Sequence, residues 1–153
     1  MKVEGEISVA APRVRVFERL SDAEFFASCI DGVSELTHNG GERYSATFTT
    51  RVAFMRFTFK VQVEMTRRDP PSDIEAKVEG NPVGVVGRLA ASARTTLSEQ
   101  EGGTLIRYAV DAALTGKLGS IGEPVLRSKA KEMEKQFAQR LRDAFAGEAE
   151  ATQ

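Results

Sequence analysis

Residues 115–137 read TGKLGSIGEPVLRSKAKEMEKQF and separate two kinds of sequence pattern. Before this stretch, most of the chain alternates apolar and polar residues, as β-strands do when one face is buried. After its glycines, apolar residues recur every four positions, as in a long amphipathic helix. The residues on this ladder are Ile121, Val125, Met133, Phe137, Leu141 and Phe145. The sequence therefore predicts a series of strands followed by one long C-terminal helix.

About seven strands are expected before that helix. The alternation is clean in residues 2–9, 43–52, 57–66, 73–80 and 106–115, and weaker in residues 33–38 and 86–98. One apolar and one polar face per strand is typical of an antiparallel sheet that buries a single face.

Two short helices are expected after the first strand. Pro12 suits the first turn of a helix, and Val14, Phe17 and Leu20 supply an apolar stripe. Ser21 and Glu24 match a capping box, which predicts that a second short helix begins at Ser21.

This order of elements predicts an α+β fold in which one long helix covers one curved antiparallel sheet. A single helix cannot cover seven strands tightly, so we expect a hydrophobic ligand site between them. The inward positions expected to line it are Tyr44, Phe48, Phe57, Phe59, Val61, Val78, Leu89, Tyr108, Val110, Ala112, Leu114, Val125, Met133 and Phe137. Residues 1–146 are expected to form this single domain, and residues 147–153 a flexible tail.

The turns at the two ends of the expected sheet differ in composition. HNGGE (38–42), RRDPPSD (67–73) and SEQEGGT (98–104) are charged, whereas AFMR (53–56), GNPVGVVG (80–87) and TGKLGSIG (115–122) are apolar and mostly rich in glycine. The SCIDG loop (28–32) is expected at the apolar end. We interpret that end as the mouth of the pocket, although loops that simply pack together and close the core would have the same composition. The expected mouth residues are Phe54, Met55, Val83, Val85, Leu118, Gly119 and Ile121.

The composition excludes several classes of protein. The 21 basic and 22 acidic residues nearly cancel, which argues against a dedicated nucleic-acid binder. Cys29 and His38 are the only cysteine and histidine, so the chain contains neither an internal disulfide nor the usual zinc site. No segment approaches the ~20 apolar residues of a membrane span, and the first residues do not resemble a signal peptide. We therefore expect a cytoplasmic location, with peripheral contact at the inner face of the membrane.

Catalytic groups are scarce at the inward positions. Only Tyr44, Tyr108 and Thr50 bring hydroxyl groups, and no carboxylate pair or lysine occupies an inward strand position. We interpret His38 as a surface residue in a polar turn and Cys29 as a packing residue. The sequence therefore favours a binding protein without turnover, without a metal and without a covalently bound cofactor.

Five stretches resemble one known family, and together they span nearly all of residues 3–145. They are GEISVAAPRVRVFERLSD (5–22), SCIDG, RRDPP (67–71), VEGNPVGVVGRLAASARTTL (78–97) and GTLIRYAVDAALTGKLGSIGEPVLRSKAKEMEKQF (103–137). The chain resembles the carbon monoxide dehydrogenase CoxG-like family, within the START-like (SRPBCC) ligand-binding superfamily. In one departure, Asp31 stands where that family usually has proline.

The resemblance implies a helix-grip fold, in which a seven-stranded antiparallel sheet wraps around a C-terminal helix and encloses a hydrophobic pocket. It also implies an accessory role beside a molybdenum hydroxylase of the carbon monoxide dehydrogenase type. That role comprises membrane recruitment and the binding of a quinone-like or isoprenoid-like lipid as electron acceptor.

Two other functions stay open from the sequence. One is a START-like cyclase or hydrolase that uses tyrosine hydroxyls on a polyketide-like substrate. The other is a protein-interaction module with a solid core.

Overall fold

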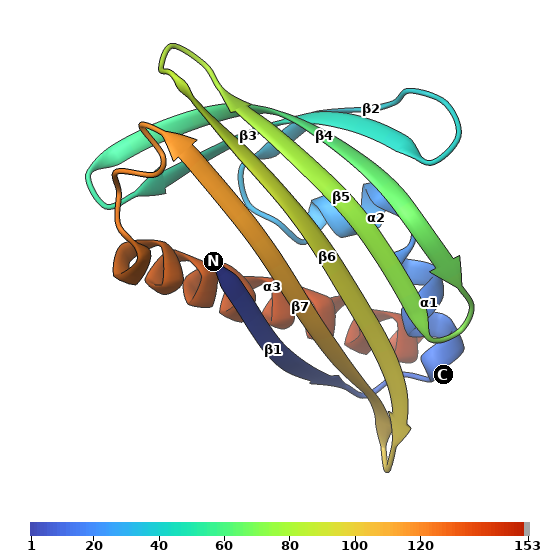
Figure 1. Cartoon of the computed structure of the whole chain (residues 1–153). Helices are drawn as coiled ribbons and strands as arrows, with labels where there is room; N and C mark the ends of the chain where they lie inside the picture. The colour runs from blue at the N-terminus through green and yellow to red at the C-terminus, as the bar shows by residue number, and fades with distance from the viewer. Residues whose placement is uncertain (152–153) are drawn as a thin grey trace.

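The computed structural model describes residues 1–151 and contains one antiparallel sheet that curves around a long helix (Figure 1). In chain order the elements are β1 (Lys2–Val9), α1 (Arg13–Leu20), α2 (Ala23–Ser28), β2 (Val33–His38), β3 (Arg43–Val52), β4 (Met55–Asp69), β5 (Asp73–Pro82), β6 (Gly87–Gln100), β7 (Gly103–Gly116) and α3 (Glu123–Ala151). The seven strands and the long helix confirm the expected α+β helix-grip fold.

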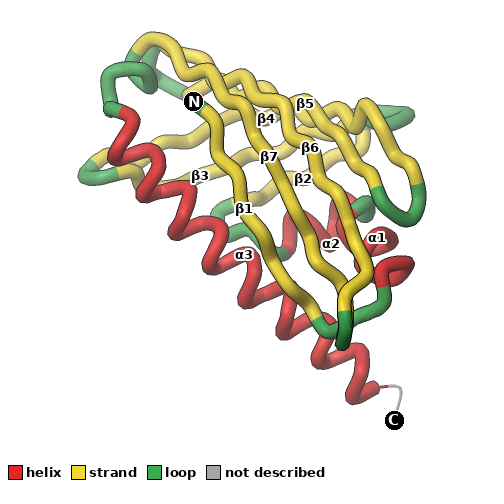
Figure 2. Tube along the Cα trace, turned by 60° about the horizontal axis from the view of Figure 1, so that its bottom comes forward, coloured by secondary structure: helices red, strands yellow, loops and turns green. Residues whose placement is uncertain are grey.

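The strand order in the sheet is β1-β7-β6-β5-β4-β3-β2. Strands β2 to β7 form successive hairpins, and β1 joins the far edge by pairing with β7. The segment that contains α1 and α2 therefore connects the two edge strands. Figure 2 shows all three helices on the same side of the sheet, so only that side is covered.

The start of α2 differs from the expected capping box. The N-cap is Asp22, whose carboxylate accepts hydrogen bonds from the backbone N–H groups of Glu24 and Phe25. Ser21 instead ends α1, where its hydroxyl donates to the carbonyl of Phe17 at 2.6 Å. The capping prediction was wrong by one residue, because the Ser21 hydroxyl is already bonded to the preceding helix.

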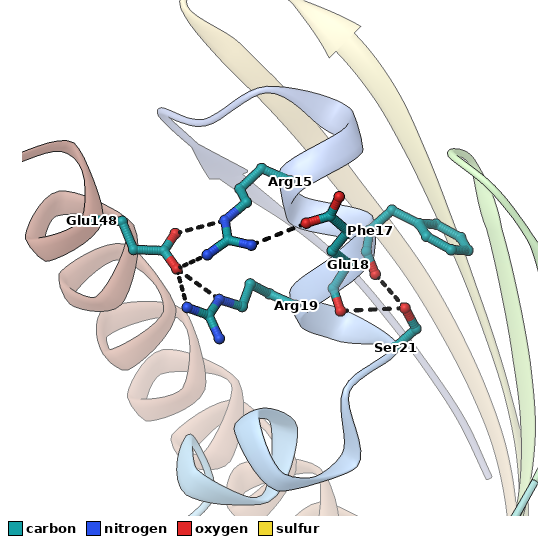
Figure 3. Close-up of polar contacts among 6 residues, drawn as sticks. All are labelled: Arg15, Phe17, Glu18, Arg19, Ser21 and Glu148. Carbon is teal, nitrogen blue, oxygen red and sulfur yellow. Dashed lines mark hydrogen bonds and ion pairs between the residues drawn. The ribbon is translucent and has the colours of Figure 1, made fainter. Parts of the chain in front are cut away.

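The C-terminal end of α3 also differs from the prediction. Residues 147–151, expected to be flexible, continue the helix, and residues 152–153 lie outside the described part of the chain. The carboxylate of Glu148 accepts hydrogen bonds from Arg15 and Arg19 of α1 (Figure 3). These contacts attach the last turns of α3 to α1, and sequence composition gives no sign of them because the partners lie far apart in the chain.

The buried apolar residues form two separate clusters. We call the larger one the α1 cluster, since it lies between α1, the sheet and the C-terminal half of α3; it contains Ile7, Val9, Ala11, Val16, Phe17, Leu20, Ile74, Leu97, Ile106, Ala138, Leu141 and Phe145. The smaller one, the loop-end cluster, contains Val52, Phe57, Phe59 and Leu118. The covered side of the sheet is thus tightly packed at two places rather than along its whole length.

Candidate ligand-binding site

Between these clusters, the covered side of the sheet is only half-buried. Six small or medium apolar residues face α3 there, in two neighbouring rows that we call the central rows: Val63, Val78 and Ala91, then Ala76, Ala93 and Val110. In a filled core these side chains would be as inaccessible as Leu97, which is 2% exposed. Their partial exposure indicates space between the sheet and the helix.

The strand register explains why the central rows are adjacent. Val63 pairs with Val78, and Val78 pairs with Ala91. Directly paired residues share a face of the sheet. The alanines leave room where longer side chains would reach α3. Ala76, Ala91 and Ala93 were absent from the predicted site, and on β6 the neighbouring Ala90 and Ser92 weaken the alternation that would have marked the inward face.

The long helix crosses this space without filling it. The backbone of α3 approaches the sheet mainly along β1 and β3, on either side of the strands that carry the central rows. Met133 is half-buried on the helix, and Phe137 packs against Phe26 of α2 with ring centroids 5.1 Å apart. The contact between Phe26 and Phe137 closes the end of the space next to the α1 cluster.

An open groove of about 510 Å³ lies at the other end of α3. It runs between the β3–β4 turn and the first turns of the helix. Its lining residues are Arg51, Val52, Ala53, Pro124, Val125, Ser128, Lys129 and Glu132. Val125, expected inside the pocket, lines this groove and is 38% exposed. A ligand passing between the turn and the helix would meet the groove first.

Apolar side chains project from the turns at the same end of the molecule. Phe54 is fully exposed, and Val83, Val85 and Val86 are exposed as well. Met55 and Ile121 are half-buried, and Gly119 is exposed. Val86 was absent from the predicted mouth, although it lies in the same glycine-bounded loop as Val85.

Leu118 does not lie at an exposed loop tip, and that part of the mouth prediction was wrong. Its side chain is 1% exposed and belongs to the loop-end cluster. The turn that carries it is closed by hydrogen bonds from Lys117 N–H to the Val86 carbonyl and from Gly119 N–H to the Gly116 carbonyl. This hydrogen-bonded turn directs Leu118 inward, so the connection between β7 and α3 is an ordered turn rather than a loose one.

The SCIDG loop is also elsewhere than expected. The carboxylate of Asp31 contacts Gln136 and Arg140, in the C-terminal half of α3. The loop therefore lies along the helix and away from the groove at its start. Burial raises the pKa of the neighbouring Cys29 thiol, which favours its neutral form.

The other predicted wall residues all lie on the covered side of the sheet. Phe57, Phe59 and Ala112 are buried. Phe48, Val61, Leu89 and Leu114 are half-buried against the loop-end cluster. Tyr44 stacks on His38 with ring centroids 4.8 Å apart, at the end of β2. Whether these residues touch a ligand stays a prediction.

One polar pair lies within this apolar surrounding. Tyr108, half-buried on β7, hydrogen-bonds to the carboxylate of Glu134 on α3. Burial and the nearby carboxylate raise the pKa of Tyr108 well above its ordinary value. Glu134 was absent from the predicted site, because a charged residue interrupts the apolar stripe formed by Ala130, Met133 and Phe137.

Two searches of the described residues bear on other kinds of site. Across residues 1–151, no three His, Cys, Asp or Glu side chains gather closely enough to hold a metal ion. Within the same part of the chain, no helix combines the length and apolar character needed to cross a membrane.

Comparison with known proteins gives one family and many similar folds. The family model for CoxG, a component of carbon monoxide dehydrogenase, matches residues 5–146. No curated protein matches the sequence significantly. A solved structure of a conserved protein from Geobacillus kaustophilus has a TM-score of 0.88 and 23% identity, covering 96% of each chain.

More distant solved structures share the fold. A protein from Rhodobacter sphaeroides has a TM-score of 0.69 and 18% identity, covering 95% of this chain and 93% of its own. Ara h 8.0201 has a TM-score of 0.65 and 16% identity, covering 96% of this chain and 98% of its own. At these identities the likeness concerns the fold alone.

Proposed function

Because this chain belongs to the CoxG family of carbon monoxide dehydrogenase, we propose that it binds a quinone-like or isoprenoid-like lipid and serves a molybdenum hydroxylase of that type. In this role it has no turnover of its own. It recruits the enzyme to the inner face of the membrane or delivers the lipid that accepts its electrons.

The half-buried central rows carry the proposal. Val63, Val78 and Val110 offer an apolar surface that the protein does not cover itself, between two clusters that are fully packed. Covering apolar surface stabilises a complex by about 25 cal/mol per Å². A ligand with a ring and an apolar chain suits a long apolar space of this kind.

The exposed turns support contact with a membrane or an acidic partner. Phe54 and Val86 project from turns at one end of the molecule, where Arg51, Arg56 and Lys117 form no ion pair among the described residues. Basic residues near an anionic lipid surface add about 1 kcal/mol each. A water-insoluble lipid needs such contact, because leaving the bilayer through water would expose its whole apolar surface.

Native mass spectrometry tests the binding part of the proposal. Protein purified without detergent should carry a lipid of defined mass, and lipid-free protein should regain one from vesicles that contain a long-chain quinone. Persistent absence of bound lipid in both experiments would contradict the carrier function and favour an interaction module.

A second experiment tests the accessory role. The lipid-loaded protein should restore electron transfer from a carbon monoxide dehydrogenase-type hydroxylase to quinone in vesicles. Transfer at the same rate without the protein would contradict delivery, while lipid binding itself would still stand.

A further inference from the structure

We propose that Glu134 and Tyr108 form the polar end of the ligand site and select a ligand that presents a hydrogen-bond donor, such as a phenolic hydroxyl, on an apolar ring. This inference rests on the proposed lipid-binding function and adds the chemical group by which the ligand is recognised.

The position of the pair supports this role. On β7, Tyr108 lies between Ile106, which is buried in the α1 cluster, and Val110, which belongs to the central rows. On α3, Glu134 lies between the half-buried Met133 and the buried Ala138. Both side chains therefore lie at the boundary where the packed core ends and the accessible space begins. A ligand in that space would meet the pair at its closed end.

The direction of the Tyr108 ring is fixed by its neighbour across the sheet. Tyr108 pairs with Gly5 of β1, and a Cβ atom at Gly5 would lie 2.5 Å from the Tyr108 hydroxyl oxygen. The ring thus lies over the bare backbone of Gly5, and its hydroxyl reaches the side of the space where α3 follows β1. Any other residue at position 5 would displace it.

The pair offers acceptors rather than donors. The raised pKa of Tyr108 keeps its hydroxyl protonated, and that single proton is donated to Glu134. What remains for a ligand is the second carboxylate oxygen of Glu134 and the lone pairs of both groups. Thr95, opposite Tyr108 on β6, can donate or accept and so does not discriminate. A ligand hydroxyl can bond to the acceptors of the pair, whereas a ligand carbonyl cannot.

A purely structural role explains the pair less well. A carboxylate on the apolar side of a helix loses hydration, which is unfavourable unless hydrogen bonds replace it. Phe137 and Phe145 show that aromatic side chains pack well on this face of α3. One bond from Tyr108 leaves Glu134 with acceptor capacity unused, and a donor from the ligand would use it.

Matched naphthalene probes test this preference. The chain contains no tryptophan, so naphthyl fluorescence can be excited without protein background. The wild-type protein should bind 2-naphthol about tenfold more tightly than 2-methoxynaphthalene, because a hydrogen bond to a charged group is worth about that factor. Glu134→Gln should reduce the difference to less than about twofold. Tyr108→Phe should keep most of it, since the carboxylate remains.

The controls separate this inference from the proposed function. Glu101→Gln, in the exposed β6–β7 turn, removes the same charge and should behave as wild type. If wild type or Glu134→Gln discriminates otherwise than expected while both probes bind, the donor preference is overturned and lipid binding stands. If neither probe binds, the lipid-binding function fails first. Should Glu134→Gln fold poorly by circular dichroism, Glu134→Met carries the same test.

Discussion

Arg15 of α1 donates a hydrogen bond of 2.6 Å to the carboxylate of Glu148, near the end of α3. The two residues are 133 positions apart in the chain. Arg19 contacts the same carboxylate, and its guanidinium lies over the ring of Phe25, 5.0 Å from the centroid. This contact holds the C-terminal half of α3 against the α1 cluster.

Replacing Glu148 should weaken the protein in a pH-dependent way. Burial opposes ionisation of Glu148, but its hydrogen bonds and charge contacts with Arg15 and Arg19 outweigh burial and lower its pKa. A carboxylate with a lowered pKa stabilises the fold above its unfolded pKa of about 4.3, and this contribution is lost as pH falls through the folded value. Glu148→Gln should therefore lower stability by about 1 kcal/mol at pH 7.

Thermal melts at two pH values check this prediction. The difference between wild type and Glu148→Gln should be about 2–4 °C at pH 7 and should shrink below about pH 4. Glu132→Gln is the control, because Glu132 is 72% exposed and pairs only with Lys129. A difference that stays constant down to pH 3 would show that ionisation of Glu148 is not its source.

Filling the central rows should block binding without harming the fold. Ala91 is half-buried, so Ala91→Trp should extend into the free space and weaken binding of 2-naphthol by at least about tenfold, with little change in Tm. Ala138 is 6% exposed within the α1 cluster, so Ala138→Phe should overpack the core and destabilise by about 1–3 kcal/mol. Equal loss of stability in both variants would mean that the central rows are ordinary core.

The strands and the long helix could be predicted because their patterns are local. Alternation along β3 and β4 and the four-residue ladder of α3 each depend on one face meeting an apolar environment. The features that were missed depend on contacts between distant segments. Glu148 remains helical because of Arg15, and Leu118 turns inward because Lys117 bonds to the carbonyl of Val86.

The candidate site was harder to predict than the fold, for a related reason. Facing residues such as Val78 and Val110 could be assigned from alternation, but their exposure depends on how far α3 stands from the sheet. Glu134 was missed because a polar residue on an apolar stripe has meaning only once its partner is known. That partner, Tyr108, is on a different element.

Charging the exposed tips should reduce membrane contact. Phe54→Asp and Val86→Asp each place a negative charge at the apolar end, where it should oppose binding to anionic vesicles and slow lipid extraction several-fold. Val14→Asp is a matched control, because Val14 is 59% exposed on α1, away from these turns. Flotation with phosphatidylglycerol vesicles measures the effect. If Val14→Asp impairs flotation as much as the tip variants, the docking surface lies elsewhere.

The glycines between β7 and α3 should differ sharply in their tolerance of a side chain. Gly116 has φ +64°, and a Cβ atom there would lie 2.5 Å from the carbonyl oxygen of Val86, so Gly116→Ala adds a backbone clash to a left-handed conformation. Gly122 has φ +99° but open space around its Cβ position, so Gly122→Ala adds conformational strain alone. We expect losses of more than about 2 kcal/mol for Gly116→Ala and about 1 kcal/mol for Gly122→Ala.

Denaturant unfolding of the two variants measures these losses, and lipid extraction measured in parallel separates stability from movement. If the β7–α3 turn only positions Leu118 and the start of the helix, Gly122→Ala should extract lipid at the wild-type rate despite its lower stability. If ligand entry needs the helix to swing about this turn, the same variant should slow extraction, because alanine restricts the left-handed conformation that the turn uses. The hydrogen bonds that close the turn favour the first outcome. Slow extraction by Gly122→Ala with an unchanged denaturant midpoint would contradict it.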